Sequence, residues 1–274
     1  MTKKKSKGEM SFLEHLEELR WLLVRSISVI LVLAGVAFFF SDFIYNEILF
    51  GPKNPDFITY KFFCQVTQYF NFEDQAICNA EMPFKIQNTN MSGQVTFMIW
   101  TCFTAGFIVG FPFILWQIWN FISPALYPNE KKNAAAFIIV SSLLFFLGVL
   151  FGYYVIVPLS VYFFGTFSVS HDIVNEFNLD SYTGMIKTAV IACGLIFELP
   201  IIIYFLSKVG LVTPEFLRKY RKYALVIVLI IAAIITPPDV ISQIIVAIPI
   251  MILYEISIFI SAFVVKKNEK QLNK

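Results

Sequence analysis

Long apolar runs constrain the fold of this chain more than any other feature of its sequence. A helix of about 20 apolar residues, rising about 1.5 Å per residue, crosses the hydrocarbon core of a bilayer. Such runs cover Trp21–Phe40, Val95–Ile118, Ala134–Val157, Met185–Leu206, Tyr223–Ile235 and Val240–Val265. The fifth run has only 13 residues, so either it extends back through the basic segment before it or the bilayer thins around it. We therefore predict an all-α integral membrane protein, a single domain over residues 1–274 with six transmembrane helices.

The composition is also that of a membrane protein. Hydrophobic residues make up 58% of the chain and charged residues 15%, with a mean hydropathy of +0.72. Soluble domains have about 45–50% apolar and about 25% charged residues. The first run ends in three phenylalanines and has no small-residue cleavage site, so we expect it to be retained as a span.

The basic residues are divided unequally between the two sides of the predicted membrane. Seventeen of the 21 lysines and arginines lie in segments that would share a side with the N-terminus. The other side has only Lys53, Lys61, Lys85 and Lys187. Because cytoplasmic segments carry the excess of basic residues, both termini are predicted to be cytoplasmic. Residues 1–20 and 266–274 would then be cytoplasmic tails, and residues 41–93 a long external loop.

Two span boundaries can be predicted in more detail. Within residues 1–20, apolar residues fall on one helical face and Glu17 and Glu18 lie mostly opposite. This pattern predicts a short helix at the membrane surface, before the chain turns into the first span. Between the fifth and sixth runs, residues 236–239 (Thr-Pro-Pro-Asp) predict a tight turn in which Asp239 caps the last helix.

Cys64 and Cys78 lie 14 residues apart in the external loop. On an oxidising face they could form a disulfide, worth about 3 kcal/mol for a loop of this length. Two reduced thiols are the alternative. Cys102 and Cys193 fall within spans and are interpreted as packing residues.

Glu198 interrupts the fourth apolar run. An ionisable side chain within a span costs about 2–3 kcal/mol and usually faces protein or water. One interpretation is a neutral glutamic acid hydrogen-bonded to a neighbouring helix. The other is a wet or partner-facing concave surface around Glu198. Pro200 cannot donate a backbone hydrogen bond, so we expect a bend in the helix there.

No catalytic, cofactor or metal-binding motif is present in the sequence, so we predict neither an enzyme nor a cofactor. His15 and His171 would lie on opposite sides of the membrane and cannot share a metal ion. Carboxylates do occur on the basic cytoplasmic side, at Glu17, Glu18 and Glu130. Glu130 alone could be a helix first-turn acid. Two carboxylates on one amphipathic surface could instead bind a pair of guanidinium groups through bidentate contacts.

Several motifs in order resemble the TatC family, the multispanning receptor of the twin-arginine protein translocase. They are Leu16–Arg20 (LEELR), Phe121–Tyr127 (FISPALY) with Glu130, Phe197–Pro200 (FELP), Thr236–Asp239 (TPPD) with Ser242-Gln243, and Leu253–Glu255 (LYE). The resemblance runs from about Met10 to Val265. The cysteine pair is not part of the family pattern.

The resemblance implies a role in protein transport. It implies six spans with both ends cytoplasmic, in the cytoplasmic (inner) membrane. It also implies binding of the twin-arginine signal peptides of folded precursors, and assembly with single-span partner subunits of the TatA/TatB type for export driven by the proton gradient. We further expect a homo-oligomer within this complex, contact with membrane lipid, and no nucleic acid partner.

The resemblance also assigns residues. The positions matching the signal-peptide site are Glu18, Leu19, Arg20, Leu23, Phe121 and Glu130. Thr236 and Gln243 match positions where the partner subunits dock, and Glu198 and Asp239 match functionally sensitive positions. Two other hypotheses remain at this point. One is a proton- or ion-coupled transporter that uses Glu198 and Glu255, and the other is a structural scaffold for other membrane subunits.

Overall fold

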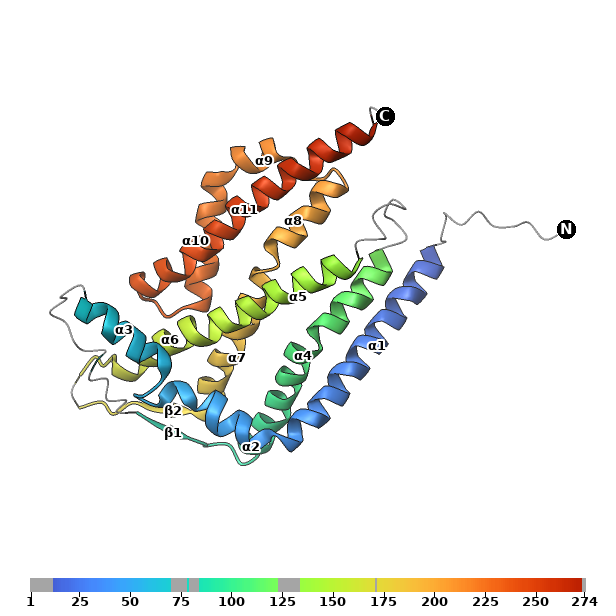
Figure 1. Cartoon of the computed structure of the whole chain (residues 1–274). Coiled ribbons are helices and arrows are strands. Elements are labelled where there is room, and N and C mark those ends of the chain that lie inside the picture. The colour runs from blue at the N-terminus through green and yellow to red at the C-terminus, as the bar shows by residue number, and fades with distance from the viewer. Residues whose placement is uncertain (1–11, 70–77, 79–83, 123–133, 171, 273–274) are drawn as a thin grey trace. The chain divides into compact units, whose positions relative to one another are not determined.

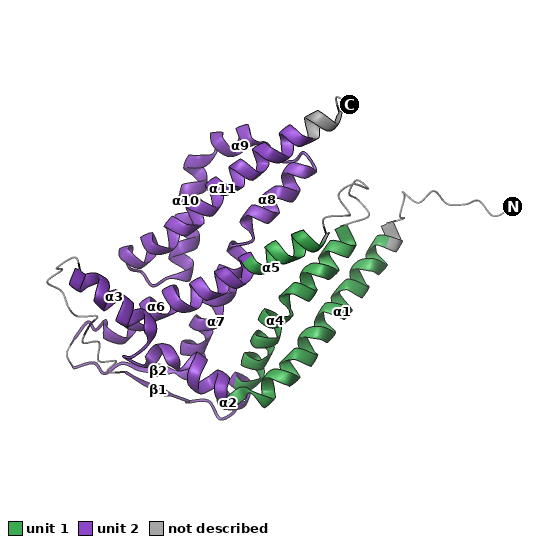
Figure 2. Ribbon diagram, viewed as in Figure 1, with its two compact units in different colours: residues 1–42, 98–143 green, residues 43–97, 144–274 purple. Residues whose placement is uncertain are grey.

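The computed structural model describes residues 12–69, 78, 84–122, 134–170 and 172–272, and most of these are helical (Figure 1). The chain divides into two compact units (Figure 2). Unit one comprises residues 1–42 and 98–143, and unit two comprises residues 43–97 and 144–274.

Unit one is built from α1 (Phe12–Phe39), most of α4 (Gly93–Ile122) and the beginning of α5 (Ala134–Phe151). The helices α1 and α4 run antiparallel and in close contact. A Cβ atom on Gly106 would lie 2.7 Å from the backbone nitrogen of Ala34 and 2.7 Å from the carbonyl oxygen of Ile30. At the N-terminal end of α1, the His15 ring stacks on Phe121 of α4 with 4.3 Å between centroids.

The prediction of a separate surface helix before the first span is wrong. In the structure α1 is one continuous helix of 28 residues, which includes both the amphipathic segment and the apolar run. The physical reason is local. No glycine or proline stands between Phe12 and Ala34, so nothing in the sequence ends the helix where its surface changes from amphipathic to apolar.

Short elements of unit two follow α1 and its continuation α2 (Ser41–Phe43). They are a π-helical segment (Ile44–Leu49), a 3-10 turn (Gly51–Lys53), the helix α3 (Ile58–Tyr69) and the strand β1 (Lys85–Gln87). The strand pairs in parallel with β2 (Glu176–Asn178), with Lys85 opposite Glu176. The sequence patterns did not predict this two-stranded sheet, because three-residue strands are too short to show a period of two.

The helix α3 is anchored to the rest of unit two. The Tyr60 hydroxyl lies 2.8 Å from the Pro52 carbonyl oxygen and 3.1 Å from that of Pro158, and the Thr59 hydroxyl donates to the Tyr154 carbonyl over 2.6 Å. Burial raises the pKa of Tyr60 above its ordinary range. Long segments of residues 41–93 therefore have a defined structure.

Seven further helical elements of unit two follow α5 in the described part of the chain. They are a π-helical turn (Gly152–Ile156) continuing into α6 (Val157–Thr166), α7 (Leu179–Ile196), α8 (Leu199–Lys208), α9 (Pro214–Lys219), α10 (Arg221–Ile235) and α11 (Val240–Leu272). The helix α8 packs against α11, and the Ser207 hydroxyl donates to the Ser261 hydroxyl over 2.7 Å. Ile203, Leu217 and Ile258 form a buried cluster beside this contact.

Five helical segments of the described chain are long and apolar enough to cross a membrane: His15–Phe39, Gly93–Ile122, Ala135–Thr166, Leu179–Lys208 and Val240–Lys267. They match five of the six predicted spans. The fifth predicted run corresponds to α10, which has 15 residues and a length of about 22 Å. The count of six spans, like the single domain, stays a prediction.

Candidate functional site

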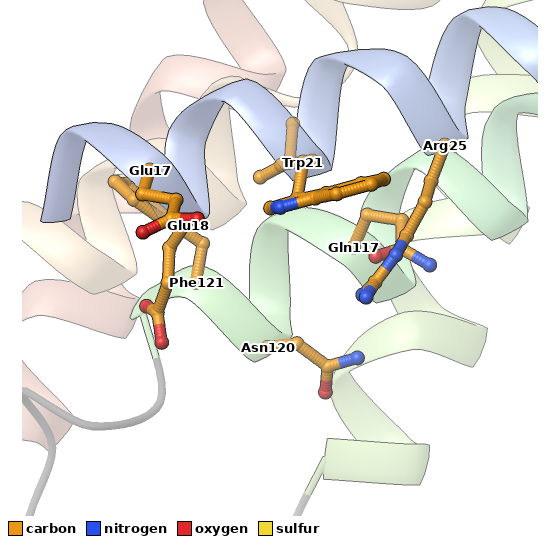
Figure 3. A pocket seen from close by; sticks show the side chains of 8 residues that line it. Glu17, Glu18, Trp21, Arg25, Gln117, Asn120 and Phe121 are labelled. Atoms are coloured by element: carbon orange, nitrogen blue, oxygen red, sulfur yellow. The ribbon is translucent and has the colours of Figure 1, made fainter. Parts of the chain in front are cut away.

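A pocket of about 460 Å³ lies between α1 and α4 in unit one (Figure 3). Its lining residues are Glu17, Glu18, Trp21, Leu22, Arg25, Gln117, Asn120 and Phe121. Most of them are polar or aromatic, although both helices are predominantly apolar. A polar recess in two apolar helices is the kind of site that binds a charged ligand near a membrane.

Helical spacing explains how the sequence builds this pocket. Trp21 and Leu22 lie three and four residues after Glu18, and Arg25 lies four and three residues after them, so all four share one face of α1. On α4, Asn120 and Phe121 lie three and four residues after Gln117. Because α1 and α4 run antiparallel, the two faces meet along about two helical turns.

The two ends of the pocket differ in charge. The carboxylates of Glu17 and Glu18 lie beside Phe121 at one end, and Arg25 and Gln117 lie at the other (Figure 3). Glu17 and Glu18 are exposed, whereas the Gln117 side chain is only 5% exposed. Adjacent carboxylates bind guanidinium groups, and an aromatic face next to them adds cation–π attraction.

Not every residue of the predicted signal-peptide site lines this pocket. Glu18 and Phe121 do. Leu19 and Leu23 are exposed elsewhere on α1, and the Arg20 guanidinium lies over the Trp21 ring at 5.5 Å from its centroid. Glu130 lies outside the described residues. The assignment of all six residues therefore stays a prediction.

The sequence interpretation missed five residues of the pocket, namely Trp21, Leu22, Arg25, Gln117 and Asn120. The pocket residues on α1 could have been predicted, because they lie on the same helical face as Glu18, three, four and seven residues after it. The exposed His15 ring, which stacks on Phe121, was not part of the predicted site either. Residues on α4 could not have been found this way, because the sequence does not say which faces of the two helices meet.

Glu198 lies in unit two, at the junction between α7 and α8. The predicted bend is confirmed, since α7 ends at Ile196 and α8 begins at Leu199 with Pro200 in its first turn. The Glu198 side chain is 7% exposed, and the neighbouring Phe197 ring lies 5.6 Å from Phe151. A concave surface around Glu198 stays a prediction.

The turn before α11 contains the predicted residues Thr236 and Asp239, and the first turn of α11 contains Gln243. Asp239 caps α11 as predicted, since its carboxylate accepts a hydrogen bond from the Ser242 backbone N–H over 2.8 Å. Burial would raise the Asp239 pKa, but hydrogen bonds from Ser242 and Ile241 outweigh it and hold the pKa below its ordinary value. The Thr236 hydroxyl donates to the Ala232 carbonyl over 2.8 Å, and the Gln243 amide donates to the Leu229 carbonyl over 2.9 Å. Their role in partner docking stays a prediction.

Glu255 is engaged in an ion pair. Its carboxylate lies 2.6 Å from the Arg221 guanidinium, which joins α11 to α10. No observation here favours a relay between Glu198 and Glu255. Within the described part of the chain, no group of three or more His, Cys, Asp or Glu side chains is arranged to hold a metal ion.

Comparison with known proteins gives consistent results. The family model described as Sec-independent protein translocase protein (TatC) matches residues 14–249. A protein of that name from Blattabacterium sp. subsp. Periplaneta americana is 42% identical over 264 residues, which cover 96% of this chain and 99% of the relative. One from Aquifex aeolicus is 35% identical over 95% of this chain and 98% of its own length.

Solved structures agree with these relatives. A crystal structure described as the twin arginine translocase receptor TatC is 35% identical in sequence and covers 90% of this chain, with a TM-score of 0.67 and 98% of its own chain matched. A second, described as the same receptor in DDM, has a TM-score of 0.70 over 90% of this chain and 99% of its own.

Proposed function

Because this chain belongs to the TatC family of Sec-independent protein translocase proteins, we propose that it is the signal-peptide receptor subunit of a twin-arginine translocase. The family transports proteins and is not a family of enzymes. The chain is a multi-pass membrane protein with several apolar helices. The receptor role comes to it from the solved relatives, which are described as twin arginine translocase receptors.

One observation carries this proposal: the carboxylates of Glu17 and Glu18 border a pocket that also contains the Phe121 ring. Two arginines in sequence present two planar guanidinium groups, each with five N–H donors. Exposed carboxylates accept these donors bidentately, which lysine ammonium groups cannot reproduce. The pocket therefore suits a paired-arginine peptide better than a paired-lysine one.

Other parts of the receptor role rest on family membership and on the charge distribution. We propose that single-span TatA/TatB-type subunits dock near Thr236 and Gln243, and that several copies of the chain assemble in one complex. We also propose that the protein resides in the cytoplasmic (inner) membrane with both termini cytoplasmic, which the excess of basic residues on that side supports. The peptide would then reach Glu18 and Glu130 from the cytoplasm.

A binding titration tests the receptor role. The protein is reconstituted in lipid nanodiscs and titrated with a fluorescent twin-arginine signal peptide and with its Lys-Lys variant. We expect the arginine peptide to bind more tightly. In Glu18→Gln we expect a loss of about 1.5–3 kcal/mol, the value of a charge-assisted contact, which is about tenfold or more in Kd.

Glu215→Gln is the matched control, because it removes one carboxylate from α9, which does not line the pocket. It should bind the arginine peptide as the parent protein does. Equal binding of the two peptides by the parent protein would contradict the receptor role. Selective binding by the parent together with unchanged affinity in Glu18→Gln would contradict only the role of Glu18.

A further inference from the structure

Arg25 gives the pocket a basic end that a receptor for arginines does not need. We propose that Arg25, together with Gln117 and Asn120, binds a hydrogen-bond acceptor of the signal peptide about three residues away from the arginine held by Glu18. This inference rests on the proposed function and adds a second point of recognition to it. The acceptor is a carboxylate, a hydroxyl or a backbone carbonyl of the peptide.

The position of Arg25 in the membrane span is the first argument. It lies 14 residues before Phe39, the last residue of α1, which corresponds to about 21 Å along the helix. This is less than the roughly 30 Å thickness of the hydrocarbon, so Arg25 belongs to the level of the inner leaflet. Charged residues at such depths face protein or water and mark ligand paths. Here the guanidinium points from α1 into the pocket, toward Gln117 (Figure 3).

The chemistry of the neighbouring groups is the second argument. Among the residues that the structure describes, none forms an ion pair or hydrogen bond with the Arg25 guanidinium. Gln117 is 95% buried yet lines the same pocket, and Asn120 lines it from about one helical turn further along α4 (Figure 3). Guanidinium and amide groups all carry N–H donors, and these three groups line one end of the same pocket. A group that accepts hydrogen bonds matches this end.

The spacing of the two ends is the third argument. Glu18 and Arg25 are seven residues apart on one face of α1, which is about 10.5 Å. An extended peptide covers about 3.3–3.6 Å per residue, so three residues span this length. One bound segment can therefore place a guanidinium at Glu18 and an acceptor at Arg25.

The positive charge of Arg25 predicts which signal peptides bind more tightly. An aspartate at the peptide position that meets Arg25 gains a charge-assisted hydrogen bond, whereas a lysine there meets a like charge. The pocket should therefore select peptides by the charge near their arginines, in addition to the arginines themselves. Elsewhere in the peptide the same substitution should matter less, because exposed charges are screened.

A charge scan tests this inference. Each position within five residues of the arginine pair of a signal peptide is changed to Asp, Ala or Lys, and Kd is measured with the full-length protein in phosphatidylcholine nanodiscs. For the parent protein we expect one position, about three residues from the arginines, where Asp binds at least tenfold more tightly than Lys. In Arg25→Glu the preference at that position should reverse, and in Gln117→Leu it should weaken.

Arg218→Glu is the control, since it makes the same charge change on α9 and should keep the parental preference. If Arg25→Glu does not fold, Arg25→Gln replaces it, with loss of the preference in place of its reversal. An unchanged preference in a folded Arg25 variant overturns the inference. The measurement is repeated in nanodiscs that contain phosphatidylglycerol. If Arg25→Glu weakens the binding of all peptides equally, and does so only in these nanodiscs, then the donors bind a lipid phosphate and the inference is overturned. A parent protein that does not distinguish the Arg-Arg from the Lys-Lys peptide contradicts the proposed function itself.

Discussion

Gly106 lies at the closest approach of α4 to α1. A Cβ atom at this position would lie 2.7 Å from two backbone atoms of α1, which cannot rotate away as a side chain can. The glycine thus sets the distance between the two helices that form the pocket. By contrast, a Cβ atom on Gly35 of α1 would meet no atom within 4 Å.

The two glycines give a matched pair of substitutions. In Gly106→Ala the helices must separate, and overpacking of this kind costs about 1–3 kcal/mol. In Gly35→Ala we expect a gain of about 0.5–1 kcal/mol, because alanine restricts the unfolded chain and favours the helix. Thermal unfolding of the purified protein in detergent measures both changes. Equal stability of Gly106→Ala and the parent protein would contradict the close contact.

Asp239 stabilises the start of α11 through a hydrogen bond that depends on pH. Removing the cap in Asp239→Ala should cost about 0.5–2 kcal/mol near neutral pH. Because the folded-state pKa lies below the ordinary value, this stabilisation is present above about pH 4 and is lost as the pH falls through the folded-state pKa. The difference in Tm between the parent and the variant should therefore shrink in acid. Asp56→Ala, a change at an exposed surface residue, is the control. An equal difference in Tm at neutral and acidic pH would contradict this assignment.

At the scale of elements, the break between α7 and α8 is a feature that local sequence is sufficient to predict. Pro200 lacks an N–H and disfavours a helical conformation for the residue before it, so a break near Glu198 could be predicted. The consequences of that break could not. Glu198 is buried, and the ring of the neighbouring Phe197 lies 5.6 Å from that of Phe151, which is 46 residues earlier in the chain.

The helix α3 is joined to residue 78 by a disulfide between Cys64 and Cys78. Cys102 and Cys193 are free and buried. In denaturant without reductant, maleimide–polyethylene glycol should therefore add to two cysteines of the parent protein and to three of Cys64→Ser, because Cys78 is then released. Loss of the bond should lower stability by about 3 kcal/mol in the chain-entropy account.

Cys193→Ser is the control for this measurement, since it removes a thiol that forms no disulfide. It should show one adduct without reductant and three with it. Four adducts on the parent protein without reductant would show that Cys64 and Cys78 are reduced thiols, the alternative left open by the sequence.

At the scale of the whole molecule, the number of membrane spans depends on whether α10 crosses the membrane. With 15 residues it is shorter than the other candidate spans. Exposed residues lie on either side of it in the sequence, Leu211 before α9 and Val240 at the start of α11. In a cysteine-free background we expect Leu211→Cys to react with an impermeant maleimide from the cytoplasmic side, and Val240→Cys from the external side. Lys219→Cys and Lys61→Cys mark the two sides as controls. Labelling of Leu211→Cys and Val240→Cys from one side would mean that α10 does not cross.

The sequence by itself determined that this is a helical membrane protein, and it located five spans, the break at Pro200 and the cap at Asp239. These properties depend on the lengths of apolar runs and on residues that are neighbours in the chain, so the sequence is sufficient to predict them. Only the tertiary structure decided which side chains share the pocket. Arg25 and Gln117 are 92 positions apart, and they meet because Gly106 lets two particular helix faces come into contact. The sequence of one helix face does not by itself specify which face of the other helix packs against it.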